Sequence, residues 1–377
     1  MQLCERRNAD GVCTMRNERE YERMRKGSIF VSLSLFLRLC TLPSSRRTRV
    51  IATERSRRSP LLALGVQPLG PPENLRYVFV ISRHGQRTPI MRCQNLPKNE
   101  PVDYGQLTAA GREQTFKLGQ FLRHRYEAFL RDCDSPGQVL ATHVSLDRCR
   151  DSIRETVRGL GVPGVPISTD PARYDVPFQA SVNANMGKAL KEPGRGKFET
   201  LGDLVYFVAE KTGAPWRNNA DKFLVMDSLV TYVLNGNPVP DWAMPMWEDL
   251  LWADRTVFAQ LLVGYERPFA ASVLGRVLDT LAEKFEKRVE SPDRMHIFSM
   301  SDTSLFSVLK LLNESHDVRP CFCASIMIEV YNDGTEVRVR VLYRTQDEPC
   351  LVPMNKLGNP CELSKFLKFL RVIISTS

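Results

Sequence analysis

The residues best suited to chemistry lie in one short loop, where Arg83, His84 and Arg87 fall within five positions. Each arginine can present forked N–H donors to a tetrahedral oxyanion. Two cations beside one imidazole disfavour its protonated form, so we expect the pKa of His84 to fall. A neutral imidazole nitrogen can attack phosphorus. The loop therefore indicates a phosphate pocket with a histidine nucleophile.

A strand must position this loop, because residues 77–81 are five consecutive apolar or aromatic side chains. Such a run is typical of a strand covered on both faces of a parallel sheet. In these sheets ligands bind beyond the carboxyl ends of the strands. An Arg-His-Gly-x-Arg sequence alone is also compatible with an ordinary basic surface loop. The strand before it and Thr88-Pro89 after it favour the site.

Residues 83–89, Arg-His-Gly-Gln-Arg-Thr-Pro, resemble the signature of the histidine acid phosphatases, the family that includes the prostatic and lysosomal acid phosphatases. The resemblance covers roughly residues 75 to 370 and includes shorter words such as Gln106-Leu107-Thr108, Asp147-Arg148 and Cys361-Glu362-Leu363. It implies hydrolysis of phosphate monoesters through a phosphohistidine on His84. It also implies that Arg83 and Arg87 bind the phosphate, and that no metal or organic cofactor takes part.

A second corner of the chain repeats the geometry of the first, since the strand predicted at 296–300 runs into a helix that starts near Asp302. In a doubly wound sheet both corners open at one edge, so Asp302 can face His84. Sequence alone also allows Ser301-Asp302 to be no more than a helix N-cap. The resemblance implies that Asp302 protonates the leaving group, which predicts an acidic optimum. His316-Asp317 follows a helix rather than a strand, and we treat it as a decoy.

Two positions depart from the family pattern. Thr142 stands where the family carries another phosphate-binding arginine, and Ser301 stands where it carries a histidine. We do not expect Arg150 or Arg154 to replace the missing charge. One hypothesis is therefore an acid phosphatase of reduced activity. The other is a catalytically degraded family member that serves as a phosphate-binding or interaction module. A sugar-phosphate phosphatase or mutase of the wider superfamily is disfavoured by the long carboxyl-terminal match.

The expected fold is α/β, with a mostly parallel doubly wound sheet flanked by helices and a smaller α-helical capping domain. Residues 73–162 and 261–377 would form the core. Residues 163–260, where prolines separate short helical patches, would form the capping insertion. Thr108 is the predicted N-cap of a long crossover helix. Residues 326–331 and 337–341 flank Asn-Asp-Gly and predict a β-hairpin.

The first 72 residues differ in composition from the rest. They carry 14 Lys and Arg against 6 Asp and Glu, which accounts for +8 of the net charge of +9. The remainder is close to neutral, which argues against a nucleic-acid partner. Residues 29–37 are mostly apolar and follow a basic cluster, as in a secretory signal, but are too few to span a bilayer. A secreted or lysosomal location and a disordered or mispredicted basic arm both remain open.

The chain has ten cysteines and five histidines, without a Cys-x-x-Cys pair, so a structural zinc site is not expected. Cys350 and Cys361 are close enough in sequence to pair around a short loop. The resemblance matches Cys323 to a family disulfide cysteine, whose partner is replaced near Thr231. The expected partner of the site is a small phosphomonoester or a phosphoprotein, and a homodimer is left open.

Overall fold

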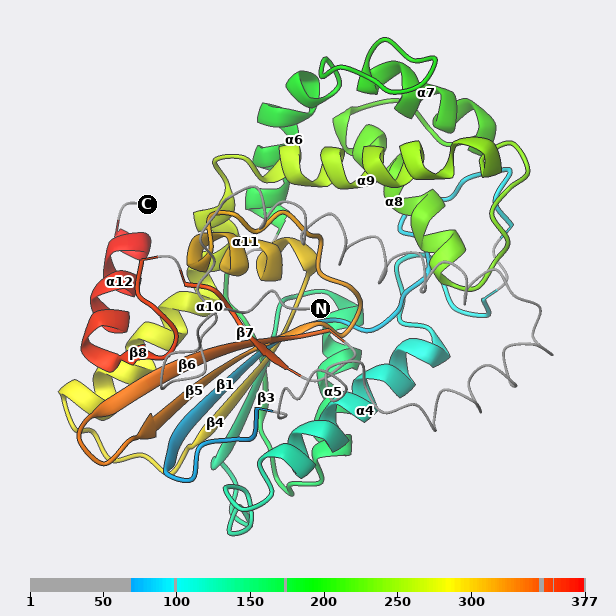
Figure 1. Ribbon diagram of the computed structural model, residues 1–377. Helices are drawn as coiled ribbons and strands as arrows, with labels where there is room; N and C mark the ends of the chain where they lie inside the picture. The colour runs from blue at the N-terminus through cyan, green and yellow to red at the C-terminus, as the bar shows by residue number, and fades with distance from the viewer. Residues whose placement is uncertain (1–68, 98–99, 173–174, 346–348, 355, 376–377) are drawn as a thin grey trace, which may run out of the picture.

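The computed structural model describes residues 69–97, 100–172, 175–345, 349–354 and 356–375, so the predicted leader lies outside the described residues. The described strands form one eight-stranded sheet in the order β3-β2-β4-β1-β5-β6-β7, with β8 also paired to β6 (Figure 1). The strands are β1 Leu75–Arg83, β2 Val139–His143, β3 Ile167–Thr169, β4 Met295–Met300, β5 Ser325–Asn332, β6 Val337–Arg344, β7 Cys350–Leu351 and β8 Cys361–Glu362.

The sheet is mixed. Strands β1 to β4 are mutually parallel, whereas β5 to β8 run antiparallel to their neighbours. The predicted α/β class is confirmed, and so is the predicted hairpin, which is formed by β5 and β6. The parallel half is the part that carries the loops at its carboxyl ends.

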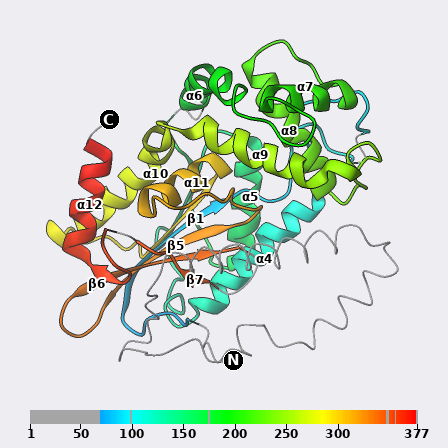
Figure 2. The ribbon, with the colours of Figure 1, turned by 45° about the horizontal axis from the view of Figure 1, so that its top comes forward.

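Strand β1 lies between β4 and β5 and is buried on both faces, as the apolar run predicts. Alternate side chains enter different clusters because successive residues of a strand point to opposite faces. Phe79 and Ile81 pack with residues of α10, α11 and α12, whereas Val78 and Val80 pack with residues of α4 and α5. Figure 2 shows these two helical layers on either side of the strands. The helices are α4 Ala109–Arg125, α5 Asp147–Leu160, α10 Glu266–Leu281, α11 Asp302–Leu312 and α12 Leu363–Ser375.

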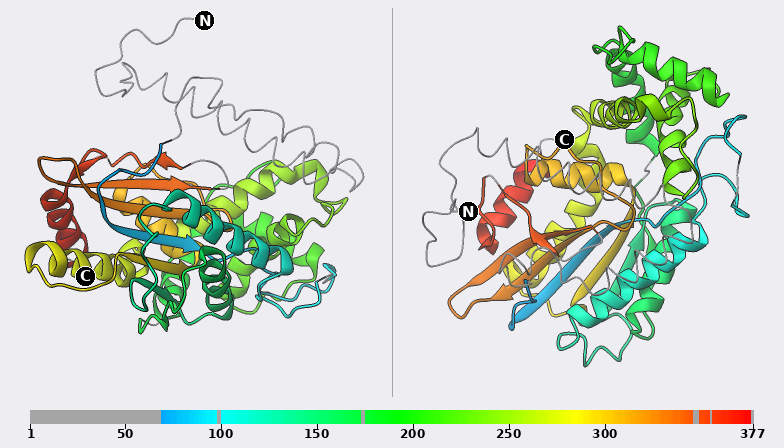
Figure 3. Two further views of the ribbon diagram at one scale, coloured as in Figure 1. Left: turned by 90° about the horizontal axis from the view of Figure 1, so that it is seen from below. Right: turned by 45° about the vertical axis from the view of Figure 1, so that its right-hand side comes forward.

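Four further helices lie beyond the carboxyl end of β1 (Figure 3). They pack around a separate hydrophobic cluster that includes Met186, Val208, Met226 and Val257. The helices are α6 Asp175–Ala189, α7 Leu201–Thr212, α8 Asn219–Leu234 and α9 Trp247–Leu262. Two short elements accompany them, the 3-10 helix η1 Met244–Met246 and the π-helical turn η2 Ala282–Glu286 that extends α10.

The division of the chain into a core and a capping domain stays a prediction, but one boundary needs correction. Strand β3 belongs to the sheet, pairing with β2 through Ala141 to His143, although residues 163–260 were expected to be helical. It was hidden in the sequence because it is only three residues long and exposed, and because Pro163 and Pro166 precede it.

The expected pairing of Cys350 with Cys361 is wrong. Cys350 and Cys361 are both free thiols. Both β7 and β8 pair with β6, but Cys350 lies opposite Tyr343 and Cys361 lies opposite Val339. Four residues along a strand span about 13 Å. A disulfide requires its Cα atoms within about 7 Å, so these two cannot be bridged without moving the strands.

No helix among the described residues combines the length and apolar character that crossing a membrane requires.

Candidate active site

His84 follows directly on the last residue of β1 and is almost completely buried. Its backbone N–H donates to the Met300 carbonyl at the end of β4, 3.0 Å away. The ring Nδ1 lies 2.8 Å from the Gly85 carbonyl, and the Arg148 Nε lies 3.2 Å from His84 Nε2. An arginine can only donate and a carbonyl can only accept, so the proton is on Nδ1. Nε2 therefore carries a lone pair, which accepts from Arg148 here and can act as a nucleophile once that hydrogen bond is released.

The surroundings of His84 keep its imidazole neutral. Burial lowers its pKa most, and the positive charges of Arg148, Arg83 and Arg87 lower it further, so the pKa lies well below the ordinary value. Both causes disfavour the imidazolium form. His84 consequently stays unprotonated into the acidic range, which is the state that attack on phosphorus requires.

Arg83 and Arg87 flank His84, and each has an N–H group without an acceptor. Arg83 donates through Nη1 to the Pro320 carbonyl at 2.7 Å and pairs through Nη2 with Asp302 at 2.9 Å. Arg87 donates through Nη2 to both oxygens of Asp227, at 2.8 and 3.0 Å. The Nε atoms of both arginines are buried and lack a hydrogen-bond partner. Buried N–H groups without an acceptor are costly, and an anion at this site would satisfy them.

Burial of Arg83 lowers the pKa of its guanidinium to about 10, against the opposing effect of Asp302. This value is still far above neutrality. Arg83 is therefore a permanent positive charge next to the nucleophile under any physiological condition. The Phe322 ring lies under the guanidinium, 4.2 Å from ring centroid to Cζ, and fixes its plane.

A network of carboxylates surrounds the arginines. Asp302, at the start of α11, pairs with both Arg83 and Arg319. Arg319 also bonds Asp227 of α8 at 2.8 Å and Asp254 of α9 at 3.0 Å. The ion pairs therefore join two helices beyond the sheet to residues at its carboxyl edge.

The pKa values of these carboxylates divide according to the arginines they meet. Burial would raise the pKa of Asp302, but Arg83 and Arg319 outweigh burial and hold it well below its usual range. Burial likewise opposes Arg87 and Arg319 at Asp227, whose pKa is lowered. At Asp254 burial prevails over Arg319, and the pKa is raised. Asp302 is therefore ionised in these ion pairs, and its expected role as proton donor stays a prediction.

The catalytic loop sits closely on the first turn of α4. Gly85 donates from its backbone N–H to Ser152 Oγ at 3.0 Å. A Cβ on Gly85 would lie 2.3 Å from the Gly111 carbonyl oxygen, and one on Gly111 would lie 2.1 Å from the Gln86 carbonyl oxygen. Thr108 caps α4 by accepting from the Gly111 N–H, as predicted. Both glycines are required because backbone meets backbone here.

The structure brings the four predicted site residues, Arg83, His84, Arg87 and Asp302, into one buried cluster. Their catalytic roles remain predictions. His316 stays outside this cluster, with Nε2 at 2.8 Å from the Val318 carbonyl, as expected of a decoy.

The two residues that depart from the family pattern are engaged elsewhere. Thr142 Oγ1 lies 2.8 Å from His296 Nε2 and 3.0 Å from Ser168 Oγ, within the sheet. Ser301 Oγ accepts from the Ser304 N–H and caps α11. Neither side chain is therefore available to a phosphate.

Sequence reasoning missed two arginines of the site. Arg148 was quoted only as part of a family word, while Arg150 and Arg154 were considered as replacements; these two face Asp147 and Asp151 on the surface. Arg148 lies at the second position of α5, just beyond the carboxyl end of β2. That position was the signal for it. Arg319 lies only two residues after the dismissed His316-Asp317 pair, and sequence offered no signal for it.

Two carboxylates were also missed, and for these a signal existed. Asp227 lies within the apolar stretch Val225-Met226-Asp227-Ser228-Leu229 of α8, and Asp254 follows Ala253 in the apolar face of α9. A charged side chain on a buried helix face is rarely left without a partner. Both therefore pointed to buried cations elsewhere in the chain.

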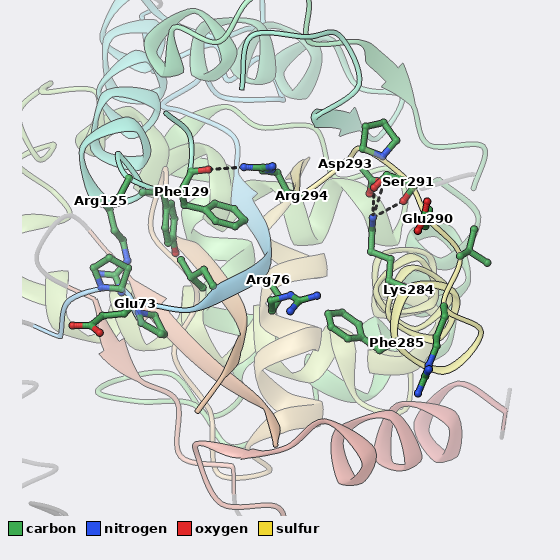
Figure 4. A pocket seen from close by; sticks show the side chains of 18 residues that line it. Glu73, Arg76, Arg125, Phe129, Lys284, Phe285, Glu290, Ser291, Asp293 and Arg294 are labelled. Atoms are coloured by element: carbon green, nitrogen blue, oxygen red, sulfur yellow. Dashed lines mark hydrogen bonds and ion pairs between the residues drawn. The ribbon is translucent and has the colours of Figure 1, made fainter. Parts of the chain in front are cut away.

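A separate cavity lies at the other end of the sheet. It measures about 1290 Å³ and is lined by the approach to β1, the end of α4 and the turn before β4, with Arg76, Phe129 and Arg294 among its residues (Figure 4). Active sites of sheets of this kind form at the carboxyl ends of the strands. The cavity is therefore separate from the cluster around His84.

Within the described ranges, no three His, Cys, Asp or Glu side chains gather in a way that would hold a metal ion. The chemistry available to the cluster is that of its imidazole, guanidinium and carboxyl groups.

Comparison with known proteins gives distant relatives over most of the chain. No family model matches. Testicular acid phosphatase of Mus musculus is 27% identical over 356 residues, which cover 81% of this chain and 82% of the relative. Prostatic acid phosphatase of Mus musculus is 25% identical and covers 84% and 90%, and lysosomal acid phosphatase of Bos taurus is 24% identical and covers 82% and 81%. The chain is thus distantly similar to the histidine acid phosphatases over most of its length.

Solved structures with the same fold are found among phytases and inositol polyphosphate phosphatases, as their names state. The phytase of Citrobacter braakii superposes with a TM-score of 0.55 at 14% identity, covering 80% of this chain and 98% of the phytase. The multiple inositol polyphosphate phosphatase of Bifidobacterium longum, in complex with inositol hexasulfate, gives a TM-score of 0.58 at 12% identity and covers 82% and 94%. At such identities the likeness concerns the fold alone.

Proposed function

We propose that this protein hydrolyses phosphate monoesters through a phosphohistidine formed on His84. The observation that carries the proposal is the state of the His84 ring. Its Nδ1–H is held by the Gly85 carbonyl, so the neutral Nε2 lone pair faces a buried ring of cations. Two donors of that ring, the Nε atoms of Arg83 and Arg87, lack a partner. A phosphate group supplies both the electrophile and the missing acceptors.

Arg148 takes the part of the family arginine that Thr142 replaces. Its Nε already donates to His84 Nε2, the atom that would attack, so its guanidinium lies where a bound phosphate would sit. Arg83, Arg87 and Arg148 would hold the phosphate oxygens, and Asp302 stands at the edge of the same cluster. Fixed donors of this kind act on charge that develops in the transition state.

The test is hydrolysis of p-nitrophenyl phosphate at acidic pH by the full chain and by His84→Ala. We expect turnover by the parent and a loss of at least about 10³-fold in the variant, because His84 supplies the imidazole on which the proposed phosphohistidine forms. His124→Ala is the matched control, since His124 is an exposed histidine of α4. Phosphate covalently retained by the parent after an alkaline quench should be absent from His84→Ala. Equal activity of His84→Ala and His124→Ala would refute the proposal.

The second candidate, a phosphate-binding or interaction module without turnover, is favoured by one specific observation. Asp302 is ionised and paired with Arg83 and Arg319, so its carboxylate carries no proton for a leaving group. Binding of inorganic phosphate that depends on Arg83 and Arg87, in a protein that turns over no ester, would support this candidate instead.

We further propose a secreted or lysosomal location. This rests on the basic and apolar leader and on relatives that include a lysosomal acid phosphatase and the venom acid phosphatase Acph-1 of Apis mellifera. Microscopy of the full chain with a carboxyl-terminal tag tests it, and a diffuse cytosolic signal would contradict it.

A further inference from the structure

Arg319 pairs with three carboxylates of the site. It lies between α11 and β5, with only 13% of its side chain exposed, over the ring of Phe258. Its donors are divided among three carboxylates. Nε and Nη2 reach Asp302 Oδ2 at 2.9 and 2.7 Å, Nη2 also reaches Asp227, and Nη1 reaches Asp254. These partners come from three different helices, so the guanidinium is fixed on every side.

The carboxylate of Asp302 is saturated by these contacts. Oδ2 accepts from Arg319 twice and forms an ion pair with Arg83, and Oδ1 accepts from the Thr303 N–H at 3.0 Å. A protonated carboxyl would have to direct its O–H at one of these donors. The charged and titratable groups that face Asp302 are Arg83, Arg87, His84 and Arg319, together with Asp227, Asp254 and Cys149.

Substrate binding would remove only one of the two arginines from the Asp302 carboxylate. A phosphate that binds Arg83 competes with Asp302 for that guanidinium. Arg319 is held in place by Asp227 and Asp254, and its described contacts all go to carboxylates. It therefore stays on Asp302 after Arg83 has turned to the substrate.

We propose that Arg319 keeps Asp302 ionised during the reaction, so that the site favours phosphates whose leaving group departs without a proton, namely aryl and acyl phosphates over alkyl phosphates. This inference rests on the proposed hydrolysis at His84. Arg319 is a positioning residue, because it acts through Asp302 and does not itself touch the substrate.

The reaction balances without a general acid. His84 Nε2 attacks phosphorus, the bond from phosphorus to the leaving oxygen breaks, and its electron pair departs on that oxygen as an aryloxide or a carboxylate. Water then attacks phosphorus, the P–N bond breaks, and its electron pair returns to Nε2 while the proton of water goes to solvent. A phenol has a pKa of about 10, whereas the pKa of an alkyl alcohol, like that of water, is far higher. The alkoxide therefore needs the proton that Asp302 lacks.

The test compares kcat/KM of the full chain for p-nitrophenyl phosphate, phenyl phosphate, acetyl phosphate and glycerol 2-phosphate. General acid catalysis contributes about 10²- to 10⁴-fold, so we expect glycerol 2-phosphate to fall at least about 10²-fold below phenyl phosphate. In the double variant Arg319→Met/Asp254→Asn, the ratio of kcat/KM for glycerol 2-phosphate to kcat/KM for the aryl esters should rise at least tenfold. The gain should be lost again as the pH rises and Asp302 ionises. Asp254→Asn alone is the matched control and should keep the preference of the parent.

Asp302→Asn gives a second measurement that does not disturb Arg319. If Asp302 donates no proton, this change alters the aryl and alkyl rates by the same factor. A much larger loss on glycerol 2-phosphate would overturn the inference, and so would a parent that hydrolyses all four substrates at similar rates. If the double variant fails to fold, the parent series and Asp302→Asn decide the question. A parent that hydrolyses none of them overturns the proposed function and the inference with it.

Discussion

Arg148 offers the sharpest test of how this site is built. It reaches His84 Nε2 at 3.2 Å, and its charge is the first, after burial, of the causes that lower the pKa of His84. Arg148→Gln removes one fixed donor from the phosphate pocket. Loss of a single preorganised donor typically costs about 10²- to 10³-fold in kcat, or about 2.7–4 kcal/mol. We expect a loss of this size for p-nitrophenyl phosphate and for esters with other leaving groups.

The pH profile separates this role from a structural one. Without Arg148 the pKa of His84 rises, because a neighbouring cation no longer opposes protonation. The acidic limb of kcat/KM should therefore move to higher pH in Arg148→Gln, while thermal stability stays close to that of the parent. Arg150→Gln is the matched control, since Arg150 lies on the same helix but bonds Asp147 on the surface. Equal rates and equal acidic limbs for the two variants would refute this account of Arg148.

Two further substitutions test the supports of the site. Gly111→Ala should lower the free energy of unfolding by about 1–3 kcal/mol, and the melting temperature with it, because its Cβ would lie 2.1 Å from the Gln86 carbonyl oxygen. Gly275→Ala in α10 should instead be neutral or stabilising, because its Cβ would meet nothing within 4 Å. Ser301→His should not raise phosphatase activity and should unfold at a lower temperature than the parent, because the buried Ser301 hydroxyl caps α11 and its loss alone costs about 1 kcal/mol. Ser301→Ala measures the contribution of the cap by itself. A gain of activity in Ser301→His would contradict this view.

Local patterns explain what could be predicted from the sequence. The run 77–81 could only be buried on both faces, and the residues after it had to emerge at the carboxyl edge of the sheet. Asp302 was found by the same reasoning, because a second strand ends beside the first in register, with Arg83 opposite Met300. Both conclusions depend on the order of residues within one segment and on the parallel pairing of two strands.

What could not be predicted depends on contacts between distant segments. Arg148 and Arg150 are two positions apart at the start of α5, and only the direction of the helix decides that Arg148 meets His84 while Arg150 meets Asp147. Arg319 meets Asp227 and Asp254 because helices α8 and α9 pack over the end of the sheet. No short sequence pattern encodes that packing, although the buried carboxylates of Asp227 and Asp254 indicated that cations elsewhere in the chain would pair with them.

The charges around His84 were not simply lost at positions 142 and 301. Three arginines, Arg83, Arg87 and Arg319, pair with three aspartates, Asp227, Asp254 and Asp302, and a fourth, Arg148, donates to His84 beside them. The family arginine and histidine would face the phosphate, whereas Arg319 faces carboxylates. On the proposal made above, Arg319 holds Asp302 ionised instead of stabilising the phosphoryl group. The position of Arg319, rather than the substitution at 301, would then decide which esters the site cleaves.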